Sequence, residues 1–193
     1  MTTRAFITQT ILWLFVIFIG IHNGAGVYEV FVITPLWAGA PPESVTGWNP
    51  VPQYAINPAK YWSIFSPVVA LLTLILLIAA WLMPPARRKW ALVAGVCLFI
   101  VVLSTLLFFV PILIKTIGTH GADFSGGEIT TMVNQWVSWN WLRLAIMIAG
   151  WLAAIRALNI SSAPIPRTQT AIEQFNGGEG KTATLFGTSS LFP

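Results

Sequence analysis

An arginine, a glutamate and a histidine lie inside stretches of this sequence that are otherwise apolar. Arg143 and Glu29 carry opposite charges, and His22 can bind or release a proton near neutral pH. An arginine at the centre of a membrane helix costs at least about 2.5 kcal/mol, so we expect Arg143 to face a bundle interior or a water-filled cavity. There it could stabilise an anionic substrate oxygen while a neighbouring base accepts a proton. We therefore predict His22, Glu29 and Arg143 as catalytic residues.

The sequence around Arg143 also supplies amide and indole side chains suited to a flat ligand. Spacings of four and three residues place Trp136 and Asn140 on the same helical face as Arg143, and Trp139 adjoins that face. Indole rings can stack on an aromatic ligand. Asn134 falls one layer higher, near the outer membrane surface. We predict Asn134, Trp136, Trp139 and Asn140 as substrate-binding residues.

Helix heights decide which of these residues can meet. Counted at about 1.5 Å per residue from Arg4 and Arg156, Glu29 lies roughly 17 Å above Arg143. Glu29 is the natural partner by charge, yet this mismatch makes Asn140, a water or a ligand the expected partner of Arg143. Two simpler interpretations stay open: a buried ion pair that only fixes helix register, and a His22 that only hydrogen-bonds a carbonyl.

The elements that position these residues are membrane helices. The chain has 193 residues, of which 56% are hydrophobic and 8% charged, and its mean hydropathy is +0.76. We predict an all-α, polytopic membrane protein, a four-transmembrane-helix up-and-down bundle within residues 1–160, because each apolar run exceeds the length that crosses a bilayer. The expected helices cover about 6–36, 61–83, 90–113 and 132–158, followed by a polar, flexible cytoplasmic tail over 161–193.

Cations near the helix ends predict the orientation. They gather at the termini and in the second connection, which favours a cytoplasmic location for that side: Arg4, Arg87, Arg88, Lys89, Arg156 and Arg167. We expect a multi-pass protein of the plasma or inner membrane with both termini cytoplasmic. The net charge of +4 then reflects topology, and no nucleic-acid partner is predicted.

The long outer loop, residues 38–60, has two open interpretations. It could form a functional cap over the bundle. Alternatively, its aromatic residues could form a belt at the lipid headgroups. The belt would comprise Trp37, Trp48, Tyr54, Tyr61 and Trp62.

Metal and cofactor chemistry finds little support in the sequence. Cys97 is the sole cysteine, and His22 and His120 are expected at different heights, which disfavours a haem held by two histidines. His120, Asp123 and Glu128 lie in one glycine-rich loop, where a solvated turn accounts for them. We predict no metal site, and the residues do not specify a cofactor.

Two stretches resemble a known family. NQWVSWNWLRLAI, Asn134 to Ile146, is similar to the last-helix signature Trp-x-x-x-Asn-His-x-Arg of the small membrane proteins grouped with the fungal anthrone oxygenases, and AGVYEVFVITPLW, Ala25 to Trp37, is similar to their first helix. The positions that match are Trp136, Asn140, Arg143 and Pro35. The sequence departs from the pattern at Trp141, where the family has histidine, and around Pro111, where VPILIK stands in place of Asn-x-Pro-x-Asn.

The resemblance implies a fold and a substrate class. Family members known as oxygenases oxidise phenolic anthrones to quinones with dioxygen, and most members have no assigned activity. Our first hypothesis is an oxygenase-like membrane enzyme with an outward-facing polar and aromatic pocket for lipophilic aromatic or quinone-type substrates, in contact with membrane lipid. The alternative is a non-catalytic accessory or assembly subunit of a larger membrane complex, or a homo-oligomer. Whether the protein is an enzyme is left open by the sequence.

Overall fold

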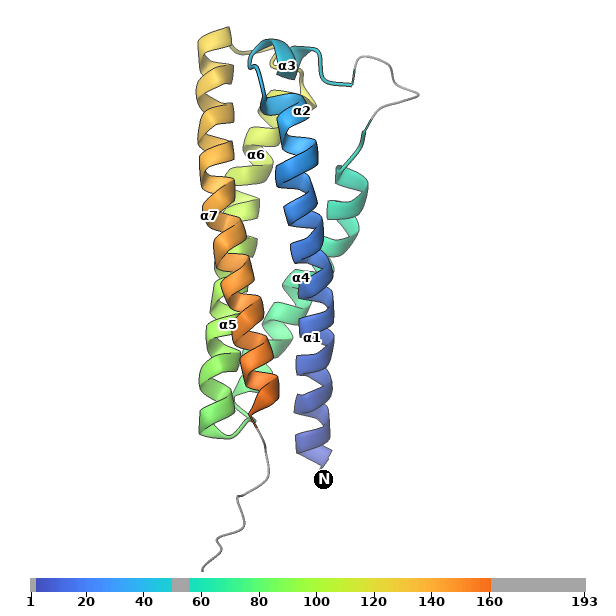
Figure 1. Cartoon of the computed structure of the whole chain (residues 1–193), viewed down its shortest axis with the longest axis vertical. Coiled ribbons are helices and arrows are strands. Elements are labelled where there is room, and N and C mark those ends of the chain that lie inside the picture. The colour runs from blue at the N-terminus through green and yellow to red at the C-terminus, as the bar shows by residue number, and fades with distance from the viewer. Residues whose placement is uncertain (1–2, 50–55, 161–193) are drawn as a thin grey trace, which may run out of the picture. The chain divides into compact units, whose positions relative to one another are not determined.

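The computed structural model describes residues 3–49 and 56–160, and four long helical spans account for most of them (Figure 1). Each span is long and apolar enough to cross a membrane, and the described ranges contain no strand, which confirms the predicted all-α membrane fold. The first span comprises α1 (Thr3–Tyr28), η1 (Glu29–Ile33) and α2 (Thr34–Ala38), and the second is α4 (Ala59–Ala80). The third comprises α5 (Pro85–Ser104), η3 (Thr105–Phe109), α6 (Val110–Leu113) and η4 (Ile114–Gly118), and the fourth is α7 (Gly126–Asn159). The segments η1, η3 and η4 are π-helical.

Local capping makes two spans begin earlier than the apolar pattern predicted. The fourth starts at Gly126 rather than 132 because the Glu128 carboxylate accepts a hydrogen bond from the Ser125 backbone N–H at 2.8 Å, and the Ser125 hydroxyl accepts one from the Glu128 N–H. The third starts at Pro85 rather than 90, since the fixed φ of proline suits a first helical turn. The predicted tail, 161–193, lies outside the described residues.

The spans form an up-and-down bundle. Helix α1 packs against α4 and α7, and α5 packs against the same two helices. Each span therefore contacts its neighbours in sequence, and the fourth returns to the first. The chain's first described turn and the end of α7 lie at one end of the bundle, while the short loop helix α3 (Glu43–Thr46) lies at the other (Figure 1).

The basic cluster between the second and third spans closes two helix ends. The Arg88 guanidinium donates to the Met83 carbonyl at 3.1 Å, just beyond α4. The buried Arg87 donates to the Ile160 carbonyl at 2.8 Å, just beyond α7. Beyond a helix end the backbone carbonyls have no intrahelical partner, and these two arginines hydrogen-bond carbonyls at such positions.

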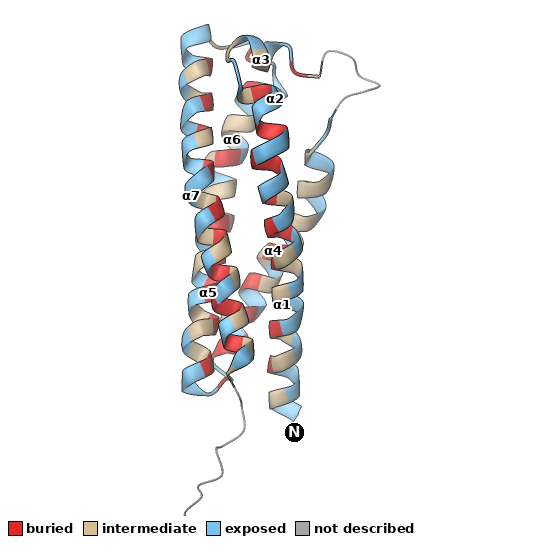
Figure 2. Cartoon of the chain, viewed as in Figure 1, coloured by how far each residue is buried: buried red, intermediate tan, exposed pale blue. Residues whose placement is uncertain are grey.

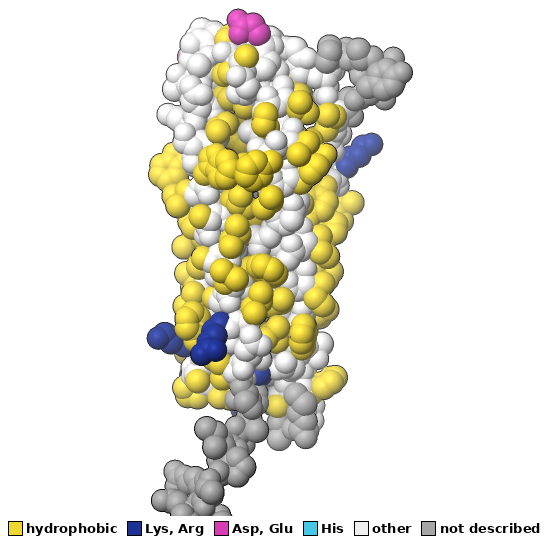
Figure 3. All heavy atoms as spheres, viewed as in Figure 1, with side chains coloured by type: hydrophobic (Ala, Val, Ile, Leu, Met, Phe, Trp, Pro, Cys, Tyr) yellow, Lys and Arg dark blue, Asp and Glu magenta, His cyan; other side chains and the backbone are white. Residues whose placement is uncertain are grey.

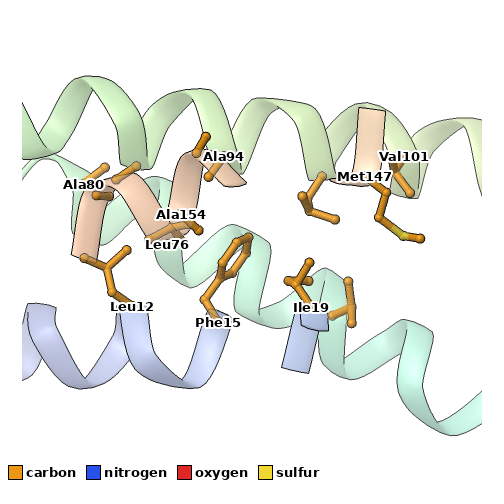
Figure 4. Close-up of a cluster of buried hydrophobic side chains, with 14 of the residues drawn as sticks. Leu12, Phe15, Ile19, Leu76, Ala80, Ala94, Val101, Met147 and Ala154 are labelled. Carbon is orange, nitrogen blue, oxygen red and sulfur yellow. The ribbon is translucent and has the colours of Figure 1, made fainter. Parts of the chain in front are cut away.

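The bundle is closely packed near the end that carries these arginines. We call the region of residues 12–19, 69–83, 91–98 and 150–157 the packed half. Its side chains interdigitate across all four spans (Figure 4), and the buried positions lie on the inward helix faces (Figure 2). At Gly150 an added Cβ would collide with Leu98 and approach the Cys97 Cβ to 2.9 Å, so glycine lets α5 and α7 approach closely here.

Large apolar side chains cover the outside of the bundle. Leu107 is 76% exposed and Ile78 is 72% exposed. Hydrophobic side chains dominate the visible face, with cationic ones mainly near the packed end and an acidic one at the opposite end (Figure 3). An exterior of this kind suits lipid as the solvent. The chain is a multi-pass membrane protein.

Candidate functional site

A cavity of about 680 Å³ lies among the four spans. We call the surrounding region, built from residues 22–37, 58–67, 101–118 and 136–147, the cavity half. Most of the wall is apolar or aromatic. Its polar residues include His22, Glu29, Thr105, Asn140 and Arg143. Four of these five are predicted site residues, and Thr105 comes from the third span. A concave, mainly apolar site with a few convergent polar groups is typical of small-molecule binding.

Arg143 meets two polar side chains from other spans. Its Nη2 lies 3.9 Å from Glu29 Oε2, and its Nη1 donates to Thr105 Oγ1 at 3.4 Å. The side chains of Arg143 and Glu29 are only 15% and 9% exposed. Both distances exceed the roughly 2.8 Å of a strong charge-assisted hydrogen bond. The guanidinium, which carries five N–H donors, therefore retains donors for a third partner.

The ion pair shows that the estimated height mismatch was wrong. We expected Asn140, water or a ligand beside Arg143, with Glu29 out of reach, because Arg4 and Arg156 were taken as level. Helix α1 instead begins beyond the last turn of α7 (Figure 1). Counting from unequal starting levels placed Glu29 too high relative to Arg143.

Two π-helical segments place the partners of Arg143. Glu29 opens η1 and Thr105 opens η3, and in each segment the N–H of the residue five positions later donates to the carbonyl of the first residue. Pro35 and Pro111 follow, each six residues after the opening residue. Proline has no N–H and crowds the carbonyl four residues earlier, and a wider π turn relieves both conflicts. Such turns often occur at functional sites.

Aromatic rings hold the guanidinium of Arg143 in place. Its Cζ lies 4.2 Å from the Phe109 ring centroid and 5.9 Å from that of Trp136. Trp136 is fully buried and packs edge-to-face against Trp37 and Phe109, with centroids 5.1 Å and 5.6 Å apart. The Trp136 Nε1 has no hydrogen-bond partner among the described residues. The site thus combines a cation with a flat apolar wall.

His22 lies at the same cavity, next to aromatic residues of the second span. It is 6% exposed, its ring contacts Trp62 edge-on at 4.9 Å and lies 6.5 Å from Tyr61, and its Nδ1 has no partner in the described part of the chain. Sequence reasoning placed Tyr61 and Trp62 only in a headgroup belt. The signal available in the sequence was their position at the start of the second span, which neighbours the first span in an up-and-down bundle.

Most of the predicted site residues line the cavity, and two do not. His22, Glu29, Trp136, Asn140 and Arg143 are all in its wall. Asn134 and Trp139 are absent from the wall and exposed, Trp139 by 54%. The helical turn of about 100° per residue explains why these two residues lie away from the cavity. It puts Asn134 nearly opposite Trp136 and turns Trp139 about 100° away from Asn140. Sequence reasoning missed Thr105, Phe109 and Trp62, because each contacts residues of another span that lie far away in the sequence.

The loop after the third span has separate roles for its three ionisable residues. Glu128 belongs to the cap of α7, and Asp123 is exposed. His120, which adopts a positive φ of 51°, contributes to the cavity wall. In the ranges 3–49 and 56–160, no group of three His, Cys, Asp or Glu side chains is arranged to hold a metal ion. The Tyr54 of the predicted belt lies outside these ranges.

Comparison with known proteins adds a family. Residues 59–153 match the family model described as anthrone oxygenase. No curated protein and no solved structure matches the chain. The matched region covers the second and third spans and most of the fourth, with Thr105, Phe109, Trp136, Asn140 and Arg143, whereas His22 and Glu29 precede it. The resemblance first seen at residues 134–146 is thereby confirmed, and residues 59–153 are similar to the anthrone oxygenase family.

Proposed function

We propose that the protein is an oxygenase-like membrane enzyme that takes a lipophilic aromatic or quinone-type molecule from the lipid into the cavity. One observation carries this proposal: the Arg143 guanidinium, 4.2 Å from the Phe109 ring centroid, borders an apolar cavity of about 680 Å³. That space is within the range of pockets for drug-sized molecules. The family match supports oxidation as the reaction class.

The reaction that fits these groups starts with proton removal from a phenolic anthrone. Loss of a proton from the ring methylene gives an aromatic enolate, which is electron-rich and carries negative charge on the former carbonyl oxygen. Dioxygen then oxidises this carbon. One oxygen atom enters the new carbonyl, the other leaves as water with the two hydrogens of the methylene, and the quinone is formed. The protein must therefore stabilise an oxyanion and accept a proton.

The polar residues of the cavity can divide these tasks. Arg143 would donate to the developing anionic oxygen, since its N–H groups are incompletely used by Glu29 and Thr105. Glu29 or His22 would accept the proton. Glu29 is already 3.9 Å from the guanidinium, so a substrate oxygen bound at Arg143 would lie close to this carboxylate.

Dioxygen consumption by the purified protein tests the proposal. Detergent-solubilised protein is supplied with a hydroxyanthrone, and the uncatalysed oxidation is subtracted. We expect turnover above that background and a loss of about 100-fold or more in Arg143→Ala. At least one of Glu29→Gln and His22→Asn, the variant that removes the base, should lose turnover to a similar or larger extent. Trp139→Ala, which alters a tryptophan outside the cavity, should retain activity.

The opposite result has a specific meaning. If a broad panel of phenols gives no turnover and the protein copurifies with a fixed membrane partner, the accessory or assembly role is favoured. Self-association without turnover would favour a homo-oligomer of structural function. A folded Arg143→Ala variant with full turnover would contradict the proposed chemistry, because it would leave the enolate oxygen without its stabilising cation.

A further inference from the structure

The cavity opens sideways between the second and third spans. On the third span Leu106, Val110 and Ile114 line the cavity, yet Leu106 is 61% exposed and Ile114 is 58% exposed. These side chains therefore border the cavity and the outside of the bundle at once. They follow one another at spacings of four residues, so they form a continuous ridge along the span.

The start of the second span forms a matching ridge. Ala59, Ser63 and Pro67 also line the cavity, are exposed, and lie four residues apart. Helix α4 packs against α5, but it makes at most slight contact with η3, α6 and η4, which continue the third span. We call the opening between these two ridges the slot.

The slot suits an aliphatic chain. None of its edge residues is charged, and the hydroxyl of Ser63 already donates to the Lys60 carbonyl at 3.3 Å. Both edges belong to spans that are long and apolar enough to cross a membrane, so hydrocarbon lies outside the slot. At its inner side, Leu106 follows Thr105, whose hydroxyl accepts a hydrogen bond from Arg143. The slot thus joins the lipid to the space beside the guanidinium.

We propose that the ligand of this cavity carries an aliphatic chain on its ring, and that the slot holds this chain while the ring lies at Arg143. This inference rests on the proposed function and narrows its substrate class to ring compounds with an alkyl or prenyl tail. The chain exchanges lipid contacts for contacts with the equally apolar Leu106, Val110 and Ile114, so it binds at little cost. A ring without a chain would leave the slot to the acyl chains of lipids.

The test compares two quinones that differ only in a chain. Radiolabelled menadione, which has no chain, and the same naphthoquinone with a decyl group on its free quinone carbon are added to the protein in lipid nanodiscs. Binding to protein-free discs is subtracted, and affinity is expressed per mole fraction of ligand in the lipid. We expect the wild type to bind both within about threefold, because the chain meets similar surroundings in the lipid and in the slot. Val110→Trp, which fills the slot, should weaken the decyl ligand about tenfold or more and menadione less than about twofold.

Two further variants separate the slot from added bulk. Leu107→Trp adds an indole on the same span, at a residue that is exposed and absent from the cavity wall, so it should leave both affinities unchanged. Ser63→Trp fills the slot from the opposite ridge and should repeat the effect of Val110→Trp. Retained menadione binding shows that a slot variant is folded. If one slot variant binds neither ligand, the other decides by the same criterion.

Every other outcome has a fixed meaning. The inference is overturned if the wild type rejects the decyl ligand, or if Val110→Trp and Ser63→Trp leave its affinity unchanged, since lipid chains alone would then occupy the slot. Equal weakening of both ligands would also overturn it, because the slot would then serve the ring. If the wild type binds neither quinone, the proposed aromatic site fails and the inference fails with it. The expected chain-selective pattern in a protein without turnover would contradict only the oxygenase activity.

Discussion

The packed half and the cavity half use the same four helices in opposite ways. In the packed half, small residues such as Ala154 and Gly150 let the helices approach closely around Leu12 and Phe15, which are fully buried. The described helices there are regular. In the cavity half, π-helical turns interrupt the first and third spans, and charged and amide groups replace the apolar contacts. Within one bundle, regular helices and small side chains build stability, whereas irregular turns and polar side chains create space for a ligand.

Two prolines accompany this division. Pro35 and Pro111 both lie in the cavity half, each six residues after the residue that opens a π turn. Each turn costs regular hydrogen bonding, but its opening residue, Glu29 or Thr105, contacts Arg143. The side-chain packing of the packed half can offset the lost hydrogen bonding, because its contacts do not depend on the cavity. Functional sites commonly retain such locally unfavourable features.

The largest expected effect comes from breaking the ion pair of the cavity half. Arg143→Met leaves the Glu29 carboxylate without its cation in a mainly apolar environment, and we expect the free energy of unfolding to fall by about 3 kcal/mol. Denaturant titration in detergent measures it. Adding Glu29→Gln should restore part of the loss, since the remaining group is neutral. An unchanged stability in Arg143→Met would show that water already solvates both charges.

The packed half should respond to added volume. Gly150→Val places methyl groups against Leu98 and Cys97, where even one Cβ would collide, and we expect a loss of about 2 kcal/mol as α5 and α7 separate. Gly24→Ala is the matched control, because its Cβ meets nothing within 4 Å, and alanine should gain about 0.5 kcal/mol in helix propensity. Thermal unfolding of both variants compares them. Equal tolerance would refute close packing in this half.

A proline substitution should shift the balance between the halves. Pro111→Ala allows η3 to return to regular α-helix, so we expect stability to rise by about 1 kcal/mol. The same change should move Thr105 away from Arg143 and reduce turnover by roughly tenfold through misplacement. Unfolding and dioxygen consumption are measured on the same sample. A gain in stability with full activity would separate the π turn from the site.

The smallest energetic effect is expected from the experiment that fixes membrane sidedness. A cysteine at Ser44, in α3 at the cavity end, should react with an impermeant maleimide added from outside, and one at Thr182 should not. Ser44→Cys weakens the hydrogen bonds of the Ser44 hydroxyl with the Trp37 carbonyl and the Ala40 N–H, so we expect it to lower the free energy of unfolding by about 0.5 kcal/mol. Labelling of Thr182→Cys alone would reverse the proposed orientation, so that the cavity half would face the cytoplasm.

Sequence patterns predicted much of this comparison. Apolar runs predicted the four spans, and the spacing of Trp136, Asn140 and Arg143 predicted their shared face, because helical periodicity and hydrophobicity are local properties. The cavity wall contains all three. The same local reasoning could not exclude Trp139, since adjoining positions were counted as part of the face without measuring the angle between them.

The sequence by itself determined the class, the four spans and the polar residues that had to avoid lipid. Only the tertiary structure decided which of those residues meet. The Glu29–Arg143 pair, the contact of Arg143 with Thr105 and the placement of Trp62 beside His22 depend on where each helix begins and how it is oriented against the others. Neither quantity is set by a single segment. Both follow from packing all four spans together, which is why a count of residues along one helix placed Glu29 out of reach.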